Sequence, residues 1–239
     1  MGLIAKKDTN WFSVQIKNAE ERKEEAMGYG AVIFDMDGVL IDSEFFYLDR
    51  TYRVLVKRYP WVKREELFPT VGMSAQEDWI LLSRLVRKQP GDAEFEKELQ
   101  EIYKDSEIKD FNDVLYPEVP GVLDRLKRQG YQIALASSSP LLTIQRMLKQ
   151  CGLEDFFDSV ISGEQVHESK PNPEIYEKTM EKLGRKPGEC LIVEDSTYGV
   201  RAGAAAGADV AARLDDRFCF DQSPAAYFIH TLDDVWKLL

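Results

Sequence analysis

Short apolar runs and amphipathic segments follow one another along most of this chain. The first apolar run, YGAVIF at residues 29–34, has the length and continuity of a strand buried on both faces of a sheet. Beyond residue 117, such runs alternate with segments that carry apolar residues at helical spacing. The predicted strands are 131–137, 158–162, 189–195 and 209–213, and the predicted helices are 120–130, 140–152, 171–184 and 196–208. This alternation predicts an α/β fold, a Rossmann-like parallel sheet with helices on both faces.

The stretch between the first strand and residue 117 follows a different pattern, because it contains no convincing strand. Helices are predicted there at 44–59, 62–68, 75–88 and 93–105, and Pro117 and Pro120 end this helical block. We therefore expect two domains and an extension. The core comprises 28–41 plus 117–239, an all-helical insertion comprises 42–116, and residues 1–27 form a charged N-terminal extension, either a solvated helix or a partly disordered arm.

Composition and charge narrow the class of protein. The 239 residues include 31 Lys and Arg against 42 Asp and Glu, and the net charge of -11 argues against a nucleic-acid partner, which needs clustered cations. Three widely spaced cysteines and two histidines favour reduced thiols over a disulfide framework or a zinc site. The sequence contains neither an apolar run long enough for a membrane span nor a secretory signal core. We expect a cytoplasmic protein with no membrane partner, and a monomer is compatible with the sequence.

Polar residues follow the predicted strands at equivalent places. In a parallel α/β sheet, ligands bind just beyond the carboxyl ends of the strands. The residues at these ends should therefore meet at one edge of the sheet. They are Asp35 and Asp37 after the first strand, Ser137, Ser138 and Ser139 at and after the end of the second, Lys170 after the third, and Glu194 and Asp195 at the end of the fourth.

Carboxylates brought together from separate strands repel one another unless a cation lies between them. A calcium-binding loop starting at Asp35 would need glycine and glutamate at its sixth and twelfth positions, where this chain has Leu40 and Phe46. A few carboxylates with a backbone carbonyl, waters and a phosphate suit Mg²⁺ instead. Lys170 would add a fixed positive charge, and Ser137 a hydroxyl able to hold a phosphoryl oxygen. These residue types together indicate phosphoryl transfer on a small-molecule phosphate ester.

Four motifs in this order, DMDGVLIDS, ALASSS, SKPNPEIY and VEDSTYGVRAGAAAGA, resemble the haloacid dehalogenase superfamily over residues 31 to 212. More narrowly, the chain is similar to the beta-phosphoglucomutase-like phosphatases, in which a helical cap is inserted after the first motif. The resemblance implies that Asp35 is the nucleophile and Asp37 the general acid and base. It implies that Ser137 and Lys170 hold the phosphoryl group, with the Ser138 backbone N–H assisting. It also implies a Mg²⁺ site formed by Asp35, the Asp37 carbonyl, Glu194 and Asp195.

The cap loop TVGMSAQEDW bears on whether water or a sugar hydroxyl accepts the phosphoryl group. Through Gly72 and Ser74 this loop resembles the substrate-facing loop of the mutases. The mutases keep a lysine before that glycine, an arginine after that serine and a histidine in the first cap helix. This chain has Val71, Ala75 and Tyr47 at or near those places, and we expect Tyr47 to pack within the helix. These departures favour a phosphatase.

The sequence thus predicts a Mg²⁺-dependent phosphatase of a small phosphorylated metabolite such as a sugar phosphate, acting through an aspartyl-phosphate. One alternative is a hexose-phosphate mutase of the beta-phosphoglucomutase type. Another, of a different class, is a non-catalytic protein that binds phosphorylated metabolites.

Overall fold

The computed structural model describes residues 28–71, 75–104 and 108–239 and places a six-stranded parallel sheet at the centre of the protein. The strands are β1 (Ala31–Phe34), β2 (Gln132–Ser137), β3 (Ser159–Ser162), β4 (Cys190–Glu194), β5 (Asp209–Arg213) and β6 (Tyr227–Ile229). Their order across the sheet is β3-β2-β1-β4-β5-β6. The predicted parallel α/β sheet is confirmed. Strand β6 was not predicted, because three residues are too few for a periodic signal.

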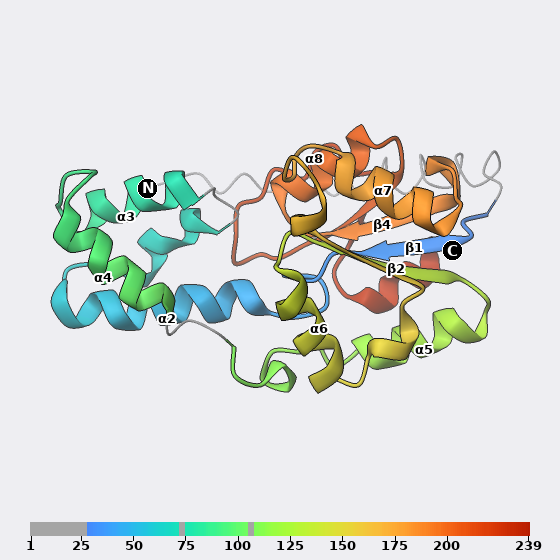
Figure 1. The fold of residues 1–239 in the computed structure, drawn as a ribbon, viewed down its shortest axis with the longest axis horizontal. Coiled ribbons are helices and arrows are strands. Elements are labelled where there is room, and N and C mark those ends of the chain that lie inside the picture. Colours follow the sequence, from blue (N-terminus) through green and yellow to red (C-terminus); the bar gives the residue numbers. More distant parts are fainter. Residues whose placement is uncertain (1–27, 72–74, 105–107) are drawn as a thin grey trace.

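Helices cover both faces of the sheet (Figure 1). On one face lie α7 (Glu174–Leu183) and α8 (Thr197–Ala205), and on the other lie α5 (Val119–Arg128), α6 (Leu141–Gln150) and the 3₁₀ helix η6 (Leu232–Lys237). Each layer encloses its own cluster of buried apolar side chains. All four residues of β1 are fully buried, as expected for a central strand covered on both faces.

The strand register brings the predicted site residues to one edge. Phe34 at the end of β1 is aligned with Leu135 of β2 on one side and Val193 of β4 on the other. Directly after Phe34 comes Asp35, and directly after Val193 comes Glu194. Because parallel strands share a direction, these two acidic residues emerge side by side at the carboxyl edge of the sheet.

The helical insertion has a core of its own. It contains α2 (Ser43–Arg58), the 3₁₀ helix η1 (Arg64–Thr70), α3 (Ala75–Leu85) and α4 (Ala93–Lys104), connected to the core through the segments on either side of it (Figure 1). Leu55, Leu67, Leu82 and Phe95 are among its buried residues. In place of the helix predicted at 62–68 the chain forms the 3₁₀ helix η1, which includes Pro69, a residue without the N–H that a regular helix would use. The exact domain boundaries stay a prediction.

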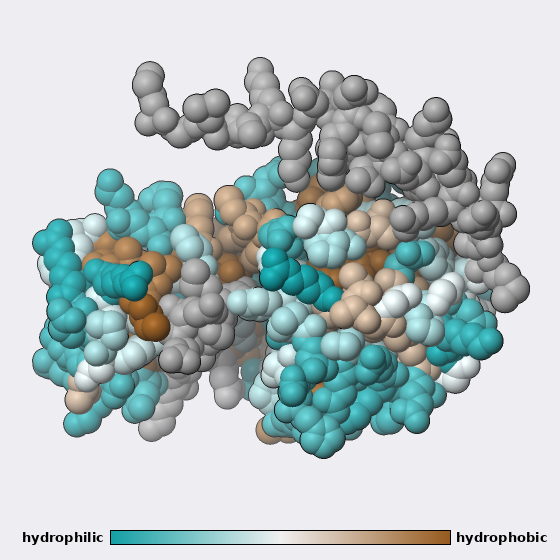
Figure 2. Space-filling view, turned by 90° about the horizontal axis from the view of Figure 1, so that it is seen from above, coloured by the Kyte–Doolittle hydropathy of each residue, from teal (hydrophilic) through white to brown (hydrophobic). Residues whose placement is uncertain are grey.

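On the face seen in Figure 2 most of the described residues are hydrophilic, and hydrophobic residues are visible on the cap lobe and around its junction with the core. None of the helices described in 28–71, 75–104 and 108–239 is long and apolar enough to cross a membrane. The predicted substrate-facing residues Gly72 and Ser74, and the extension 1–27, lie outside the described residues.

Candidate active site

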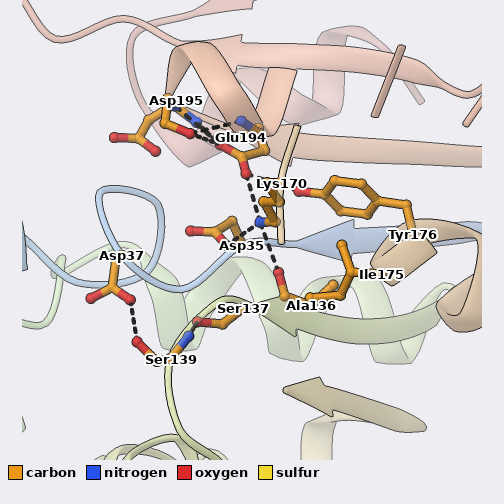
Figure 3. A network of polar contacts seen from close by, with 12 residues as sticks. Asp35, Asp37, Ala136, Ser137, Ser139, Lys170, Ile175, Tyr176, Glu194 and Asp195 are labelled. Atoms are coloured by element: carbon orange, nitrogen blue, oxygen red, sulfur yellow. Dashed lines mark hydrogen bonds and ion pairs between the residues drawn. The ribbon is translucent and has the colours of Figure 1, made fainter. Parts of the chain in front are cut away.

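Lys170 joins the ends of three strands (Figure 3). Its ammonium Nζ donates hydrogen bonds to Asp35 Oδ1 at 2.6 Å, to Glu194 Oε1 at 2.7 Å and to the Ala136 carbonyl at 3.1 Å. The lysine side chain is only 6% exposed. Burial disfavours its charged form, but the two carboxylates outweigh that effect and hold the pKa of Lys170 well above its usual value. Lys170 is therefore a fixed positive charge at the edge of the sheet.

Glu194 is held in one orientation by both of its oxygens. Besides Lys170, Oε1 accepts a hydrogen bond from the Tyr176 hydroxyl at 2.9 Å. Oε2 accepts from the backbone N–H groups of Asp195 at 2.8 Å and Ser196 at 3.0 Å. The first turn of α8 runs so close that a Cβ on Gly199 would collide with the Glu194 carboxylate. Glu194 was predicted from the sequence, but Tyr176 and Gly199 were not predicted as its supports.

Asp35, Glu194 and Asp195 form a buried acidic cluster in which ligand oxygens lie within 4.8 Å of one another. Burial and the neighbouring carboxylates raise the pKa of Asp195 well above its usual value. Burial likewise raises the pKa of Asp35, although Lys170 opposes it. Since one ammonium cannot balance three carboxylates, the donor set fits a divalent cation with oxygen ligands.

Gly38 allows the loop after β1 to pass directly over Asp195. Its φ of +73° lies in the left-handed region, and a Cβ there would meet the Asp195 carboxylate. The position directly after Asp35-Met36-Asp37 therefore requires glycine for two reasons, backbone conformation and close approach.

Asp37 faces a different side of the site from Lys170 (Figure 3). Its Oδ1 accepts a hydrogen bond from the Ser43 hydroxyl at 2.6 Å, and its Oδ2 accepts one from the Ser139 hydroxyl at 2.8 Å. Ser43 is the first residue of α2, so the start of the cap helps to orient this carboxylate. From the sequence, Ser139 was expected only at this edge of the sheet without a defined role, and Ser43 was not predicted as a residue of the site.

The three serines after β2 take different positions. Ser137 is fully buried, and its hydroxyl accepts a hydrogen bond from the Ser139 backbone N–H at 3.1 Å (Figure 3). Ser138 and Ser139 line the cavity at the site. The assignment of phosphoryl binding to Ser137 and Ser138 stays a prediction.

The site opens into a cavity of about 350 Å³. The cavity is lined by the predicted residues and by four further ones. Glu44 and Tyr47 come from helix α2, Ser196 is the N-cap residue of α8, and Tyr198 lies in α8. Tyr47, expected only to pack, lines the cavity and also contacts Phe46 edge-to-face with ring centroids 5.7 Å apart. Burial and the charges of neighbouring acidic groups raise the pKa of Glu44 to about 7.

A parallel sheet that carries a buried lysine and a cluster of three buried carboxylates at its carboxyl edge is typical of one class of hydrolase. The chain belongs to the haloacid dehalogenase-like hydrolases, and the family match covers residues 29–207. The resemblance stated from the four motifs is thereby confirmed.

Several known proteins are similar over most of the chain. A phosphorylated carbohydrates phosphatase of Thermotoga maritima is 35% identical over 74% of this chain and 81% of its own length. The pyrophosphatase PpaX of Bacillus cereus is 30% identical over 89% of this chain and 97% of its own. A solved Thermotoga maritima structure, provisionally assigned as a beta-phosphoglucomutase, has a TM-score of 0.66 at 29% identity, with 87% and 97% of the two chains covered.

Proposed function

We propose that this protein is a Mg²⁺-dependent phosphatase that hydrolyses a small phosphorylated metabolite, a sugar phosphate, through an aspartyl-phosphate on Asp35. The observation that carries the proposal is the buried Lys170 bridge between Asp35 and Glu194 at 2.6 and 2.7 Å, beside a second aspartate that faces the cavity. The similarity to a phosphorylated carbohydrates phosphatase and to a pyrophosphatase supports phosphate transfer to water.

Asp35 is suited to attack phosphorus because Lys170 holds one of its oxygens and leaves the other for the nucleophilic step. In that step an O–P bond forms at Asp35 while the ester O–P bond breaks. Asp37 gives a proton to the departing alkoxide oxygen. In the second step Asp37 takes a proton from water, whose oxygen attacks the aspartyl-phosphate, releasing inorganic phosphate and the free Asp35 carboxylate.

Charge repulsion explains why the site needs its cations. A carboxylate about 4 Å from one unit of phosphate charge is repelled by roughly 4 kcal/mol at an effective dielectric constant near 20. The Lys170 ammonium opposes part of this repulsion at the attacking group itself. Asp35, Asp195 and the Asp37 carbonyl would hold Mg²⁺, with Glu194 as a further candidate ligand. When bound, the ion would neutralise charge on the phosphoryl oxygens.

The remaining cavity lining supports a polyhydroxylated leaving group. Glu44, Tyr47 and Tyr198 bring a carboxylate and two phenol groups to a cavity of about 350 Å³. A carboxylate accepts hydrogen bonds and phenols both donate and accept, which matches the hydroxyls of a sugar. Inorganic pyrophosphate has no carbon-bound hydroxyls and would leave this part of the cavity without such partners.

Product analysis on sugar phosphates and inorganic pyrophosphate, with Mg²⁺ and with EDTA, tests the proposal. We expect free phosphate from a sugar phosphate only when Mg²⁺ is present, and loss of turnover in Asp35→Asn. Full turnover by Asp35→Asn would show that the nucleophile is assigned wrongly. An isomeric sugar phosphate formed faster than free phosphate would instead indicate a mutase, despite Val71, Ala75 and Tyr47. Binding without turnover of any ester would indicate a non-catalytic binding protein.

A further inference from the structure

The connection between β5 and β6 leaves the core and contacts the cap. Figure 1 shows this orange-red segment extending from the sheet towards the cap helices. Phe218, in this connection, is only 7% exposed and belongs to the apolar cluster of the cap. Its ring packs against Phe68 of η1 with centroids 6.2 Å apart and an interplanar angle of 89°. A core residue thus forms part of the buried interior of the cap.

A second contact lies where the cap chain leaves the core. The Arg217 guanidinium donates two hydrogen bonds to the Asp42 carboxylate, at 2.9 and 2.7 Å, and also pairs with Asp215. The same guanidinium lies over the ring of Phe45 in α2, 5.0 Å from its centroid. The two-bond geometry fixes the orientation of the arginine relative to the start of the cap.

Both ends of this connection are hydrogen-bonded to the backbone of the loops that carry Asp37 and Asp195. Arg213, at the end of β5, is 8% exposed and donates from Nη1 to the Gly38 carbonyl at 2.8 Å. Gln222 is 7% exposed, and its Nε2 donates to the carbonyls of Asp195 and Arg213. Residues 214–222 therefore connect the backbone beside Asp37 and at Asp195 with the interior of the cap.

We propose that residues 214–222 form a latch that sets the position of the cap over the active site, with Phe218 and Gln222 as its positioning residues. Phe218 fixes the latch to the cap, and Gln222 fixes it to the core at Asp195. A cap connected only through its two ends could swing about them. With the latch in place, swinging the cap would require Phe218 to leave an apolar interior or Gln222 to lose two buried acceptors, both of which cost free energy.

The proposal predicts that loosening the latch at Phe218 or at Gln222 will spread the cap over many positions. Because substrate binds to the cap position that completes the cavity, reducing the population of that position raises the apparent dissociation constant in proportion. Once substrate is bound, the cap is returned to the same position. Weakening the latch at Phe218, which contacts no residue of the site, should therefore raise KM by about tenfold while kcat changes by less than about twofold.

The position of the cap is tested by pulsed electron–electron double resonance, which measures the distribution of distances between nitroxide labels on two exposed residues. The labels are attached at Lys97→Cys in α4 and Lys182→Cys in α7, with Cys151→Ser and Cys219→Ser removing competing thiols. We expect one narrow distance distribution for the parent protein. Phe218→Ala and Gln222→Leu should both broaden it, although Phe218 contacts the cap and Gln222 contacts the core, and Phe218→Leu should restore most of the narrow distribution.

Phe95→Ala is the matched control, because Phe95 is fully buried in the same cap cluster but packs against Tyr59 of the cap itself, with ring centroids 6.1 Å apart. This variant should destabilise the cap and leave the distance distribution narrow. The proposal is wrong if the parent distribution is already broad, or if Phe218→Ala or Gln222→Leu matches the parent. Should Phe218→Ala fail to fold, Gln222→Leu decides alone. The distance measurement needs no substrate, so its outcome is independent of whether the protein is a phosphatase.

Discussion

The ammonium of Lys170 lies 2.6 Å from Asp35 Oδ1, and the two side chains are 6% and 9% exposed. On the surface of α7, Lys178 lies 2.7 Å from Glu174 Oε1, a nearly identical separation, but there the side chains are 36% and 19% exposed. Water screens the second pair and not the first. Environment, rather than distance, therefore distinguishes the two pairs, and we expect a substitution at Lys170 to have much the larger effect.

Replacing Lys170 by methionine should lower kcat/KM by about a thousandfold, because Asp35, the proposed nucleophile, loses its neighbouring positive charge. The metal-free protein should also lose about 3 to 5 kcal/mol of unfolding free energy, since Asp35 and Glu194 would remain buried without their partner. Steady-state kinetics and urea denaturation in EDTA measure the two effects.

Lys178→Met is the control for that substitution. It makes the same change of side chain in an exposed pair, so we expect unchanged kinetics and only a small change in the free energy of unfolding. Similar stability losses in the two variants would contradict the view that burial gives the Lys170 bridge its effect.

Because the pKa of Glu44 is raised, we expect the free energy of unfolding of the metal-free protein to depend on pH. Its pKa rises from 4.5 to about 7 on folding, through burial and the charges of Asp37, Asp42 and Glu194. The folded state therefore retains a proton that the unfolded state releases, and the stabilising contribution is present below pH 4.5 and lost as the pH rises through 7. Glu44→Gln, which cannot ionise, should be more stable than the parent at pH 8 by up to about 3 kcal/mol.

Urea denaturation in EDTA between about pH 5 and pH 8 checks this prediction. Glu65→Gln, which replaces an exposed glutamate of the same cap, should leave the pH profile of the parent unchanged. Parallel profiles for Glu44→Gln and the parent would mean that the pKa of Glu44 does not rise on folding.

The carboxyl edge of the sheet could be predicted from sequence because its chemistry follows visible apolar runs. Asp35 comes directly after the buried run AVIF, and Glu194 ends the run CLIVE. The supports of those residues follow no such signal. Tyr176 lies within a helix and contacts Glu194 only in the folded chain. Gln222 lies within an irregular connection and likewise reaches Asp195 only in the folded chain.

Three further contacts could not be predicted, because the residues that make them show no distinctive local pattern. Tyr47 lies on a helix whose spacing indicates packing, and periodicity cannot distinguish a side chain that packs from one that packs and also lines a cavity. The contact of Ser139 with Asp37 was missed because a hydroxyl two residues beyond a strand has no characteristic spacing from that aspartate. Phe218 contacts Phe68 from a distant part of the sequence, so no local pattern relates the two rings.

The two serines that hold Asp37 should affect turnover more than substrate binding. Ser139→Ala and Ser43→Ala each remove one hydrogen bond to a carboxylate, an interaction that typically contributes about 1.5 to 3 kcal/mol. We expect kcat to fall by about tenfold in each single variant and further in the double variant. Ser223→Ala, on the exposed surface, is the control. Unchanged kcat in both single variants would show that Asp37 is oriented by other contacts.

Two glycines in helices should respond in opposite directions to the same substitution. Alanine is favoured over glycine within a helix by up to about 1 kcal/mol. A Cβ on Gly121 in α5 would have no atom within 4 Å, so Gly121→Ala should stabilise the protein by about 0.5 to 1 kcal/mol without changing kinetics.

At Gly199 in α8 the added methyl would meet the Glu194 carboxylate and push it away from Lys170. Gly199→Ala should therefore lower both the unfolding free energy and kcat/KM, the latter by about a hundredfold. Thermal denaturation and kinetics of the two variants are measured side by side, and a Gly199→Ala protein that behaved like Gly121→Ala would show that α8 does not hold Glu194 in place.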